Sequence, residues 1–323
     1  MREFRIPAVS IGLVREAKLA WVGAFGLRSA DAREPVRDGT VFEAASLGKP
    51  LFALGVMKLV EAGRFDLNRP LVDSMPRPFV PTRDPLMSAP DIPDDPRLRQ
   101  ITPRLVLRHA TGLPNWGQGK PLRFLSNPGA AYTYSGEAFY FLQRVVEHVT
   151  GQGAEAFLRR TVLDPLGMKR SSYVWQRDYE RTAAIRHDRE EKPFSNVRPS
   201  RAMVAGSLHT TAGEYARFLA AMMDAGPAGA FGLFAALRAE MLRPATHVND
   251  EISWGLGWGL QTSPAGTAFW HWGNNPGTKC FAIGYPREGI GIVVLTNSDN
   301  GLRGVVRIIP AAIGGGEPAY FRT

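Results

Sequence analysis

The segment covering residues 42–63 constrains the fold more than any other, because its central part is apolar on nearly every side. Between Pro50 and Val60, only Lys58 carries a charge. A helix of this composition is expected in the middle of a domain, where all of its faces are buried. We expect it to end at Gly63, since glycine readily takes the left-handed conformation that follows a helix. The rest of the chain must therefore build a core around this helix.

The start of this helix carries an unusual pair, Ser46 and Lys49, which are three residues apart and so share one face of the first turn. A lysine entering a buried helix must be paired or lose its proton, because burial disfavours the charged ammonium. A neutral or strongly hydrogen-bonded lysine beside a serine hydroxyl is one way to activate a nucleophile. The ordinary alternative is that Ser46 caps the helix and Lys49 extends to water. The pair alone leaves both interpretations open.

The remaining bulk properties are those of a globular chain. Its 323 residues are enough to bury a large core and to form two lobes. No apolar run approaches the roughly 18 residues that span a bilayer, so no transmembrane segment is expected. The first residues lack the features of a signal peptide, which predicts a cytoplasmic protein, or a periplasmic or secreted one if the N-terminus is truncated. The single cysteine, Cys280, excludes an internal disulfide.

The net charge of +9 raises the question of an anionic partner. The arginines are interspersed with acidic residues, and no nucleic-acid-binding motif is present, so a nucleic-acid partner is not expected. Solubility or attraction of anionic small substrates explains the charge better. The six histidines are scattered without metal-ligand spacing, and we expect neither a metal nor a cofactor.

Strand patterns occur at both ends of the chain and helical patterns in between. Residues 8–14 and 19–27 predict a hairpin, and residues 254–261, 267–272, 278–285 and 290–296 predict further strands before a closing helix at 301–313. We interpret Gly255, Gly257 and Gly259 as strand glycines at places of close backbone approach. Residues 102–109, 136–150, 155–163 and 211–224 have helical periodicity. The Pro- and Asp-rich stretch at 66–103 predicts a long irregular connection, which usually surrounds a functional site.

Two further short stretches stand at element boundaries. Tyr134-Ser135-Gly136 lies where a turn enters the helix at 136–150, and His271-Trp272-Gly273 ends a predicted strand. Each has an ordinary explanation when taken alone, Tyr134 as a half-buried core phenol and His271 as a hydrogen-bonded strand histidine.

Taken together and in this order, the three stretches resemble the Ser-x-x-Lys, Tyr-x-Asn and Lys/His-x-Gly motifs of the serine β-lactamase and penicillin-binding-protein superfamily. Other stretches resemble landmarks of the same family, namely Leu-Arg-His-Ala-Thr-Gly-Leu-Pro at 107–114, Pro-Leu-Gly-Met at 165–168, Ala-Gly-Ser-Leu-His-Thr-Thr-Ala at 205–212 and His-Trp-Gly-Asn-Asn-Pro-Gly at 271–277. The branch that it resembles contains class C β-lactamases, D-alanyl-D-alanine carboxypeptidases and family VIII carboxylesterases.

The resemblance implies a fold of the α/β (α+β) class, an antiparallel sheet flanked by helices with an inserted, mainly helical lobe. Residues 1–66 and 201–323 would form the sheet domain from both termini. Residues 67–200 would form the lobe, and the active site would lie in the cleft between them.

The resemblance also implies a role for each motif residue. Ser46 corresponds to the nucleophile, Lys49 to the lysine that activates it and Tyr134 to the phenol that moves protons. The backbone N–H groups of Ser46 and Asn274 correspond to the oxyanion hole. His271 corresponds to the residue that helps to bind a substrate carboxylate and supports proton transfer. We treat Lys49 and Tyr134 as a coupled pair, and we expect the pKa of both to move from about 10 toward working pH.

Two departures from the family pattern bear on the substrate. Gly136 replaces the asparagine of the second motif, which weakens the case for efficient β-lactam turnover. Trp272 stands where a small hydroxyl residue is common, and an indole favours an apolar acyl or alcohol group. We expect Gly136, Trp272, Gly273 and Trp116 to line the substrate site, with Trp254 and Trp258 near its rim.

The function that the resemblance implies is that of a serine hydrolase acting through an acyl-enzyme. Its partner would be a small-molecule acyl substrate, an ester or a peptide-like compound of the D-Ala-D-Ala type. Two alternatives stay open, a class C-like β-lactamase and a penicillin-binding sensor or scaffold without turnover. The oligomeric state is left open.

Overall fold

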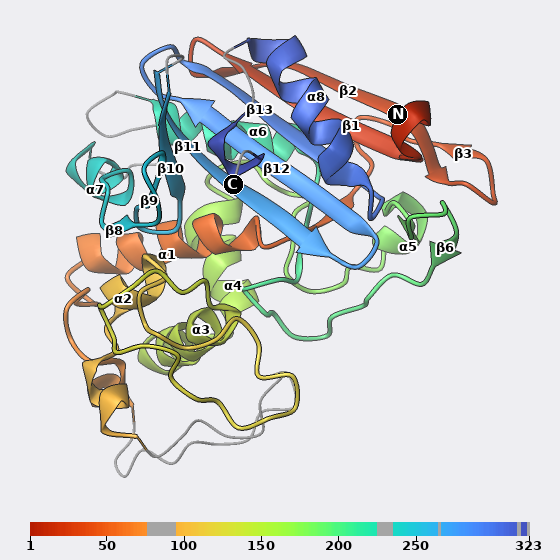
Figure 1. Ribbon diagram of the computed structural model, residues 1–323. Coiled ribbons are helices and arrows are strands. Elements are labelled where there is room, and N and C mark those ends of the chain that lie inside the picture. Colours follow the sequence, from red (N-terminus) through yellow and green to blue (C-terminus); the bar gives the residue numbers. More distant parts are fainter. Residues whose placement is uncertain (76–94, 225–234, 264–265, 315–317, 322–323) are drawn as a thin grey trace.

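A computed structural model describes residues 1–75, 95–224, 235–263, 266–314 and 318–321. Within these ranges, nine strands form one antiparallel sheet in the order β3-β2-β1-β13-β12-β11-β10-β9-β8 (Figure 1). Their bounds are β1 Ala8–Arg15, β2 Lys18–Ser29, β3 Glu34–Pro35, β8 Thr246–His247, β9 Ile252–Trp254, β10 Gly259–Ser263, β11 Gly266–Asn275, β12 Thr278–Tyr285 and β13 Ile290–Thr296. Two short strand pairs lie outside this sheet: β4 Phe42–Ala45 with β7 Leu208–Thr210, and β5 Arg186–His187 with β6 Pro193–Phe194.

The two ends of the chain meet in the middle of the sheet. Strand β1 pairs with β13, with Val9 opposite Thr296, and with β2 on its other side. Apolar strands this far apart in sequence pair because each buries one face against a shared core. The prediction of one antiparallel sheet built from both termini is confirmed.

Helices cover both faces of the sheet, as predicted. Helix α6 contacts β1, β2, β12 and β13 on one face, and α8 contacts β12 and β13 on the other (Figure 1). The helices are α1 Gly48–Glu61, α2 Pro103–Leu107, α3 Gly136–Thr150, α4 Ala154–Leu158, α5 Tyr179–Thr182, α6 Ala212–Met223, α7 Ala235–Met241 and α8 Gly301–Ile313. Short 3-10 turns η1 Arg2–Phe4, η2 Leu71–Ser74, η3 Pro96–Gln100 and η5 Ala319–Phe321 and the π-helical turn η4 Arg159–Leu163 complete the elements.

Helix α1 lies in the larger of the two main cores, and every residue from Gly48 to Met57 is buried. Gly63 follows it with a φ of 65°, as the sequence predicts. The helix does not include the residues before Gly48, because Phe42–Ala45 forms β4 and pairs with β7. Ser46 therefore lies in the turn that joins β4 to α1, and not within a helix.

Other predicted elements differ in detail. Helix α3, strands β12 and β13 and helix α8 have the predicted bounds. The strand predicted at 254–261 is wrong, because a turn separates β9 from β10. Gly257 takes a φ of 85° in that turn, and a Cβ on Gly255 would lie 2.2 Å from the carbonyl oxygen of Met241. Close backbone approach is thus confirmed for Gly255, although outside a strand. The nearest atoms to a Cβ on Gly257 and on Gly259, which does lie in β10, belong to the side chains of Ala53 and Trp270. Residues 76–94 of the predicted long connection lie outside the described residues, and the domain boundaries at 66/67 and 200/201 stay a prediction.

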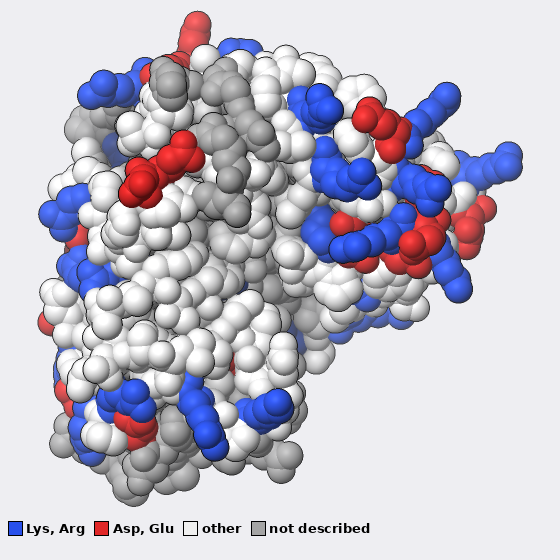
Figure 2. Space-filling model, viewed as in Figure 1, with Lys and Arg blue, Asp and Glu red and all other residues white. Residues whose placement is uncertain are grey.

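The charged residues show no single-sign stripe on the face in Figure 2. Basic and acidic side chains lie side by side around one end of that face, and much of the remaining surface is uncharged. Among the described residues, no helix is both long and apolar enough to cross a bilayer.

The contact between β11 and β4 gives a first prediction. A Cβ added to Gly273 would lie 2.2 Å from the carbonyl oxygen of Ala44, so Gly273→Ala forces the two backbones apart. We expect the free energy of unfolding in urea to fall by about 1–3 kcal/mol. The control is Gly153→Ala, where nothing lies within 4 Å and the cost should stay below about 1 kcal/mol. Equal stability of the two variants would contradict this account of the contact.

Candidate active site

Ser46 is held in a tightly fixed turn between a strand and a helix. Ala45, directly before it, has a φ of 50°, a conformation that costs an L-residue roughly 1–2 kcal/mol. Two buried tyrosines form hydrogen bonds with the backbone directly after Ser46. The hydroxyl of Tyr215 donates to the carbonyl of Leu47 at 2.9 Å, and that of Tyr173 donates to the carbonyl of Gly48 at 2.6 Å. The surrounding core thus supports a strained backbone next to the candidate nucleophile, as is common at functional sites.

Lys49 is completely buried and points back at Ser46. Its Nζ lies 2.9 Å from Ser46 Oγ and 2.6 Å from the carbonyl oxygen of Ala205, while Ser46 Oγ lies 3.2 Å from the same carbonyl. Among the residues that the structure describes, no carboxylate forms an ion pair with Lys49. Burial without a counter-charge lowers the pKa of Lys49 to about 7, as the sequence predicts. A large part of the Lys49 side chains is therefore neutral at physiological pH, and a neutral amine can accept a proton.

Tyr134 lies directly before the N-cap of α3, Ser135, whose Oγ accepts the N–H of Ala138 at 3.0 Å. The Nζ of Lys49 lies 4.9 Å from the centre of the Tyr134 ring. The buried Tyr134 hydroxyl makes no hydrogen bond of good geometry with the described residues. Burial raises the pKa of Tyr134, although the nearby Ser46 hydroxyl acts to lower it.

The expectation that the phenol pKa would fall is therefore wrong. The lysine faces the ring of Tyr134 and carries only part of a charge, so the cost of burying a phenolate is the larger effect. In the free protein Tyr134 is a neutral hydroxyl group.

His271 on β11 is fully buried, and its ring nitrogens have different roles. Nδ1 lies 2.7 Å from the carbonyl oxygen of Trp272. Because a carbonyl only accepts, Nδ1 carries the hydrogen and Nε2 keeps a lone pair. Burial, and to a lesser extent the charge of Lys49, lowers the pKa of His271 to about 3. The residue is therefore a neutral hydrogen-bond acceptor, which does not suit the binding of a carboxylate.

His109, which follows α2, is a member of this cluster that the motif analysis missed. Its ring stacks on that of Tyr134, with centres 4.2 Å apart, and its Nδ1 accepts the N–H of Ser135 at 3.0 Å. Burial lowers the pKa of His109 well below its usual value. The residue lies within the 107–114 stretch that resembles a family landmark, but nothing in the sequence places its ring on Tyr134.

Of the tryptophans expected at or near the substrate site, Trp116 and Trp272 lie against other site residues, whereas Trp254 is fully buried. Trp116 lies against Gly136, where an added Cβ would come within 2.5 Å of the indole, so the indole occupies the space that a larger residue at 136 would need. Trp272 packs at a tilt on Tyr134, with ring centres 4.8 Å apart. Trp254 does lie near His271, at 5.6 Å, but it is fully buried and so does not form a rim.

The expectation that Trp258 lies near the rim is wrong, because it is fully buried. It packs in the core against Phe218 and Phe269, with ring centres 5.6 and 4.8 Å away. The sequence around Trp258 resembles a strand, and this pattern does not show on which face of the sheet the side chain lies.

The end of β11 lies beside β4, the strand that directly precedes Ser46. Gly273 packs against the carbonyl of Ala44. Asn275 Nδ2 donates to Glu43 Oε1 at 2.5 Å and to the carbonyl of Gly206 at 3.0 Å. Asn274, between these two contacts, is exposed. This arrangement supports the predicted oxyanion hole of Ser46 and Asn274, which stays a prediction.

Comparison with known proteins adds to this geometry. A family model described as Beta-lactamase matches residues 1–313. The chain belongs to the β-lactamase family. The resemblance inferred from the motifs is thereby confirmed.

Relatives within and around the β-lactamase family carry different names. The chain is similar to esterase EstB of Burkholderia gladioli, with 29% identity over 60% of this chain and 53% of the esterase. It is 25% identical to penicillin-binding protein 4 of Amycolatopsis lactamdurans over 91% of this chain and 82% of that protein. The octameric penicillin-binding protein homologue from Pyrococcus abyssi has a similar structure, with a TM-score of 0.81 at 21% identity, covering 98% of this chain and 76% of that one. The chain thus spans about half the length of the esterase, and its fold is that of the β-lactamases and penicillin-binding proteins.

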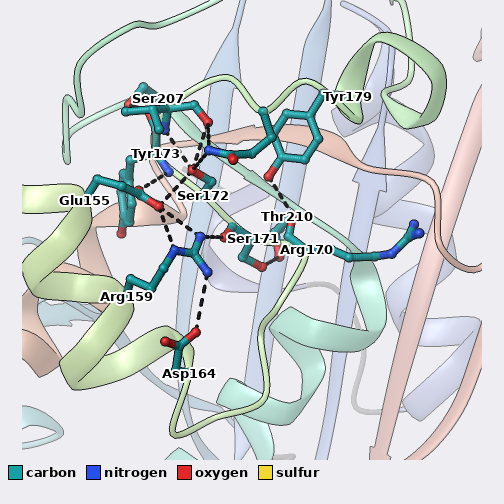
Figure 3. A network of polar contacts seen from close by, with 12 residues as sticks. Glu155, Arg159, Asp164, Arg170, Ser171, Ser172, Tyr173, Tyr179, Ser207 and Thr210 are labelled. Carbon is teal, nitrogen blue, oxygen red and sulfur yellow. Dashed lines mark hydrogen bonds and ion pairs between the residues drawn. The ribbon is translucent and has the colours of Figure 1, made fainter.

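In this β-lactamase-family chain, a polar network fixes Tyr173, which holds the first turn of α1 (Figure 3). Glu155 of α4 accepts the N–H of Tyr173 at 2.7 Å and the hydroxyl of Ser172 at 2.9 Å. Arg159 donates to Glu155 at 2.9 Å, and Ser207 donates to the carbonyl of Tyr173 at 2.8 Å. The position of the candidate nucleophile therefore depends on contacts that reach into the helical part of the chain.

The lowered pKa of Lys49 predicts how Ser46 reactivity depends on pH. We expect the rate of Ser46 labelling by a fluorophosphonate to rise about tenfold per pH unit below 7 and to level off above it. Below pH 7 the amine is protonated and cannot accept the serine proton. No second inflection is expected between pH 5 and 8, because burial keeps His109 and His271 neutral there. The measurement is labelling kinetics from pH 5 to pH 9.

The matched control for this prediction is Lys49→Met, which introduces an unbranched apolar side chain only one atom shorter than that of lysine. It should fold, because a buried apolar group replaces a buried amine, and labelling should fall by about 10²–10⁴-fold. A flat pH profile in the wild type, or normal labelling of the variant, would show that Lys49 is not the base.

Proposed function

We propose that the protein is a serine hydrolase that forms an acyl-enzyme on Ser46 and acts on uncharged esters. The observation that carries this proposal is the contact of a fully buried Lys49, with a pKa of about 7, with the hydroxyl of Ser46 at 2.9 Å. A serine beside a neutral amine is an activated nucleophile. Membership of the β-lactamase family supports the same chemistry.

In the first step, Ser46 Oγ attacks the carbonyl carbon of the substrate and its proton passes to Lys49 Nζ. The Oγ–carbon bond forms while the carbonyl π pair moves to oxygen. The backbone N–H groups of Ser46 and Asn274 are proposed to stabilise that oxyanion, and loss of one such donor in a known protease costs about 10²–10³ in rate. The carbonyl of Ala205, which accepts from Lys49 at 2.6 Å, stabilises the ammonium that results.

In the second step, the tetrahedral intermediate collapses and the bond to the alcohol breaks. The neutral Tyr134 hydroxyl is suited to donate a proton to the leaving alkoxide and to regain one from Lys49, which leaves the serine ester and a free amine. A water molecule then attacks the ester carbon, Lys49 accepts its proton, and the acid is released with the proton returned to Ser46. In this proposal Lys49 is the base and Tyr134 moves the proton.

The preference for uncharged esters follows from the surroundings of His271. Its buried Nε2 carries a lone pair and makes no hydrogen bond with the described residues, so it attracts a donor and repels a carboxylate. The indole of Trp116, which lies against Gly136, and that of Trp272, which lies against Tyr134, add apolar surface. This favours an ester over a D-Ala-D-Ala-type peptide or a β-lactam, both of which carry a carboxylate. One relative of the chain is named an esterase.

The proposal is tested with p-nitrophenyl acetate and a chromogenic cephalosporin, combined with intact-mass spectrometry. We expect steady turnover of the ester, slower turnover of the cephalosporin and a transient mass increase of one acetyl group. Ser46→Ala should remove both the turnover and the mass increase while leaving the melting temperature within a few degrees. Faster turnover of the cephalosporin would favour a β-lactamase, and a stoichiometric burst without steady turnover would favour a sensor.

The charge preference gives a sharper prediction. The matched substrates are 3-carboxyphenyl acetate and 3-(methoxycarbonyl)phenyl acetate, which differ in one negative charge on the leaving group. We expect kcat/KM for release of the phenol to be at least about tenfold higher for the uncharged compound, because His271 stays neutral above its pKa of about 3. A preference for the acid would show that the site binds a carboxylate and that the ester assignment is wrong.

A further inference from the structure

Four aromatic rings from distant parts of the chain form one continuous column through the candidate site. His109 stacks on Tyr134 at 4.2 Å between ring centres, Tyr134 lies 4.8 Å from Trp272, and Trp272 stacks on Tyr320 at 4.9 Å. The planes of neighbouring rings differ by 30°, 32° and 23°, so the first and last contacts are stacked and the middle one, between Tyr134 and Trp272, is tilted. The last member, Tyr320, belongs to the C-terminal turn η5 and to none of the sequence motifs.

The His109 end of the column is fixed by hydrogen bonds on both sides of Tyr134. The carbonyl of His109 accepts the N–H of Thr133 at 2.7 Å, and its Nδ1 accepts the N–H of Ser135 at 3.0 Å. His109 itself takes a φ of 52°, which is uncommon for a residue other than glycine. His109 thus binds the backbone on both sides of Tyr134, and these hydrogen bonds help to fix the position of the Tyr134 ring.

The Tyr320 end is fixed to the sheet. The N–H of Ala319, which is buried, donates to Gln261 Oε1 on β10 at 3.0 Å. The N–H of Phe321 closes the turn on the carbonyl of Pro318 at 3.0 Å. Tyr320 also lies 5.3 Å from Trp270, a buried residue of β11. Both ends of the column are thus anchored, and Tyr134 and Trp272 lie between them.

Tyr134 needs such support because its hydroxyl, although near that of Ser46, makes no hydrogen bond of good geometry with the described residues. Ring packing then carries most of the task of directing that hydroxyl toward Ser46 and Lys49. We propose that Tyr320 is a positioning residue which, by stacking on Trp272, holds Trp272 and Tyr134 in place beside Ser46. This inference rests on the proposed function, in which Tyr134 moves a proton and Trp272 forms a wall of the substrate site.

The first test compares Tyr320→Ala with Tyr320→Phe, which keeps a ring in the column. The matched control is Phe321→Ala. Phe321 is a ring of the same turn that packs at a tilt on Phe281 at 5.0 Å and meets Tyr320 edge-on at 5.1 Å, so its loss removes a neighbour of Tyr320 but no ring of the column. With p-nitrophenyl acetate we expect Tyr320→Ala to lower kcat at least tenfold with little change in KM. Tyr320→Phe and Phe321→Ala should stay within about twofold of the wild type in kcat, even if Phe321→Ala lowers the melting temperature as much as Tyr320→Ala does. Equal kcat values for Tyr320→Ala and Phe321→Ala would overturn the proposal.

The second test does not depend on activity. In protein made with tyrosine carrying ¹³C at both ε positions, a fixed ring gives two signals and a rapidly flipping ring gives one. With Tyr134 assigned from Tyr134→Phe, we expect two signals in the wild type, Tyr320→Phe and Phe321→Ala, and one averaged signal in Tyr320→Ala. A single signal in the wild type, or two in Tyr320→Ala, would overturn the column as a positioning device. If the wild type does not hydrolyse the ester, the proposed function fails, and the ring signals still decide whether Tyr320 holds Tyr134.

Discussion

The contact of Lys49 with two uncharged oxygen atoms is the interaction on which the rest of the site depends. Among the described residues, the buried ammonium has a hydroxyl and a carbonyl as hydrogen-bond partners and no carboxylate, so burial is not offset and the pKa of Lys49 falls to about 7. The carbonyl of Ala205 is one of the few groups that stabilise the ammonium form, so its position next to the amine matters. Gln143 of α3 binds both the carbonyl of Ala202 and the N–H of Val204, at 2.8 and 2.9 Å, and Asn275 of β11 binds the carbonyl of Gly206. A helix and a strand thus hold the segment around Ala205 from two sides, and the polar network behind Tyr173 holds the start of α1.

The same absence of counter-charges extends to the other titratable groups around Ser46. Burial keeps His109 and His271 neutral and keeps the Tyr134 hydroxyl protonated, so Lys49 is the group in this cluster that changes charge near pH 7. The hydrogen bonds of the two histidines give them opposite tautomers. Nδ1 of His109 accepts from Ser135, whereas Nδ1 of His271 donates to Trp272. A substrate therefore meets fixed dipoles and apolar rings, which is the setting in which one proton acceptor can act without competition.

The sequence predicted most of the fold, because a regular spacing of apolar residues shows which face of a helix or strand is buried, whatever it packs against. The bounds of α3 and of β12 and β13 follow from local pattern alone. The start of α1 could not be predicted in this way, since Phe42–Ala45 becomes a strand only by pairing with β7 far along the chain. The site motifs brought Ser46, Lys49, Tyr134 and His271 into one hypothesis, and these residues do lie together. The ring of His109, the raised pKa of Tyr134 and the place of Tyr320 depend on tertiary packing, for which no spacing in the sequence is a guide.

The close approach of Trp116 to Gly136 has a consequence for how such a site could change over time. The indole fills the volume that a side chain at position 136 would need. A larger residue at 136 clashes with Trp116, and a smaller one at 116 leaves a void beside Gly136. Either change alone therefore makes the packing worse. An asparagine at 136, the residue of the motif that this sequence resembles, would need Trp116 to move or to be replaced by a smaller residue. The two positions therefore form a coupled pair, and a variant that gains the amide is expected to need a change at 116 as well.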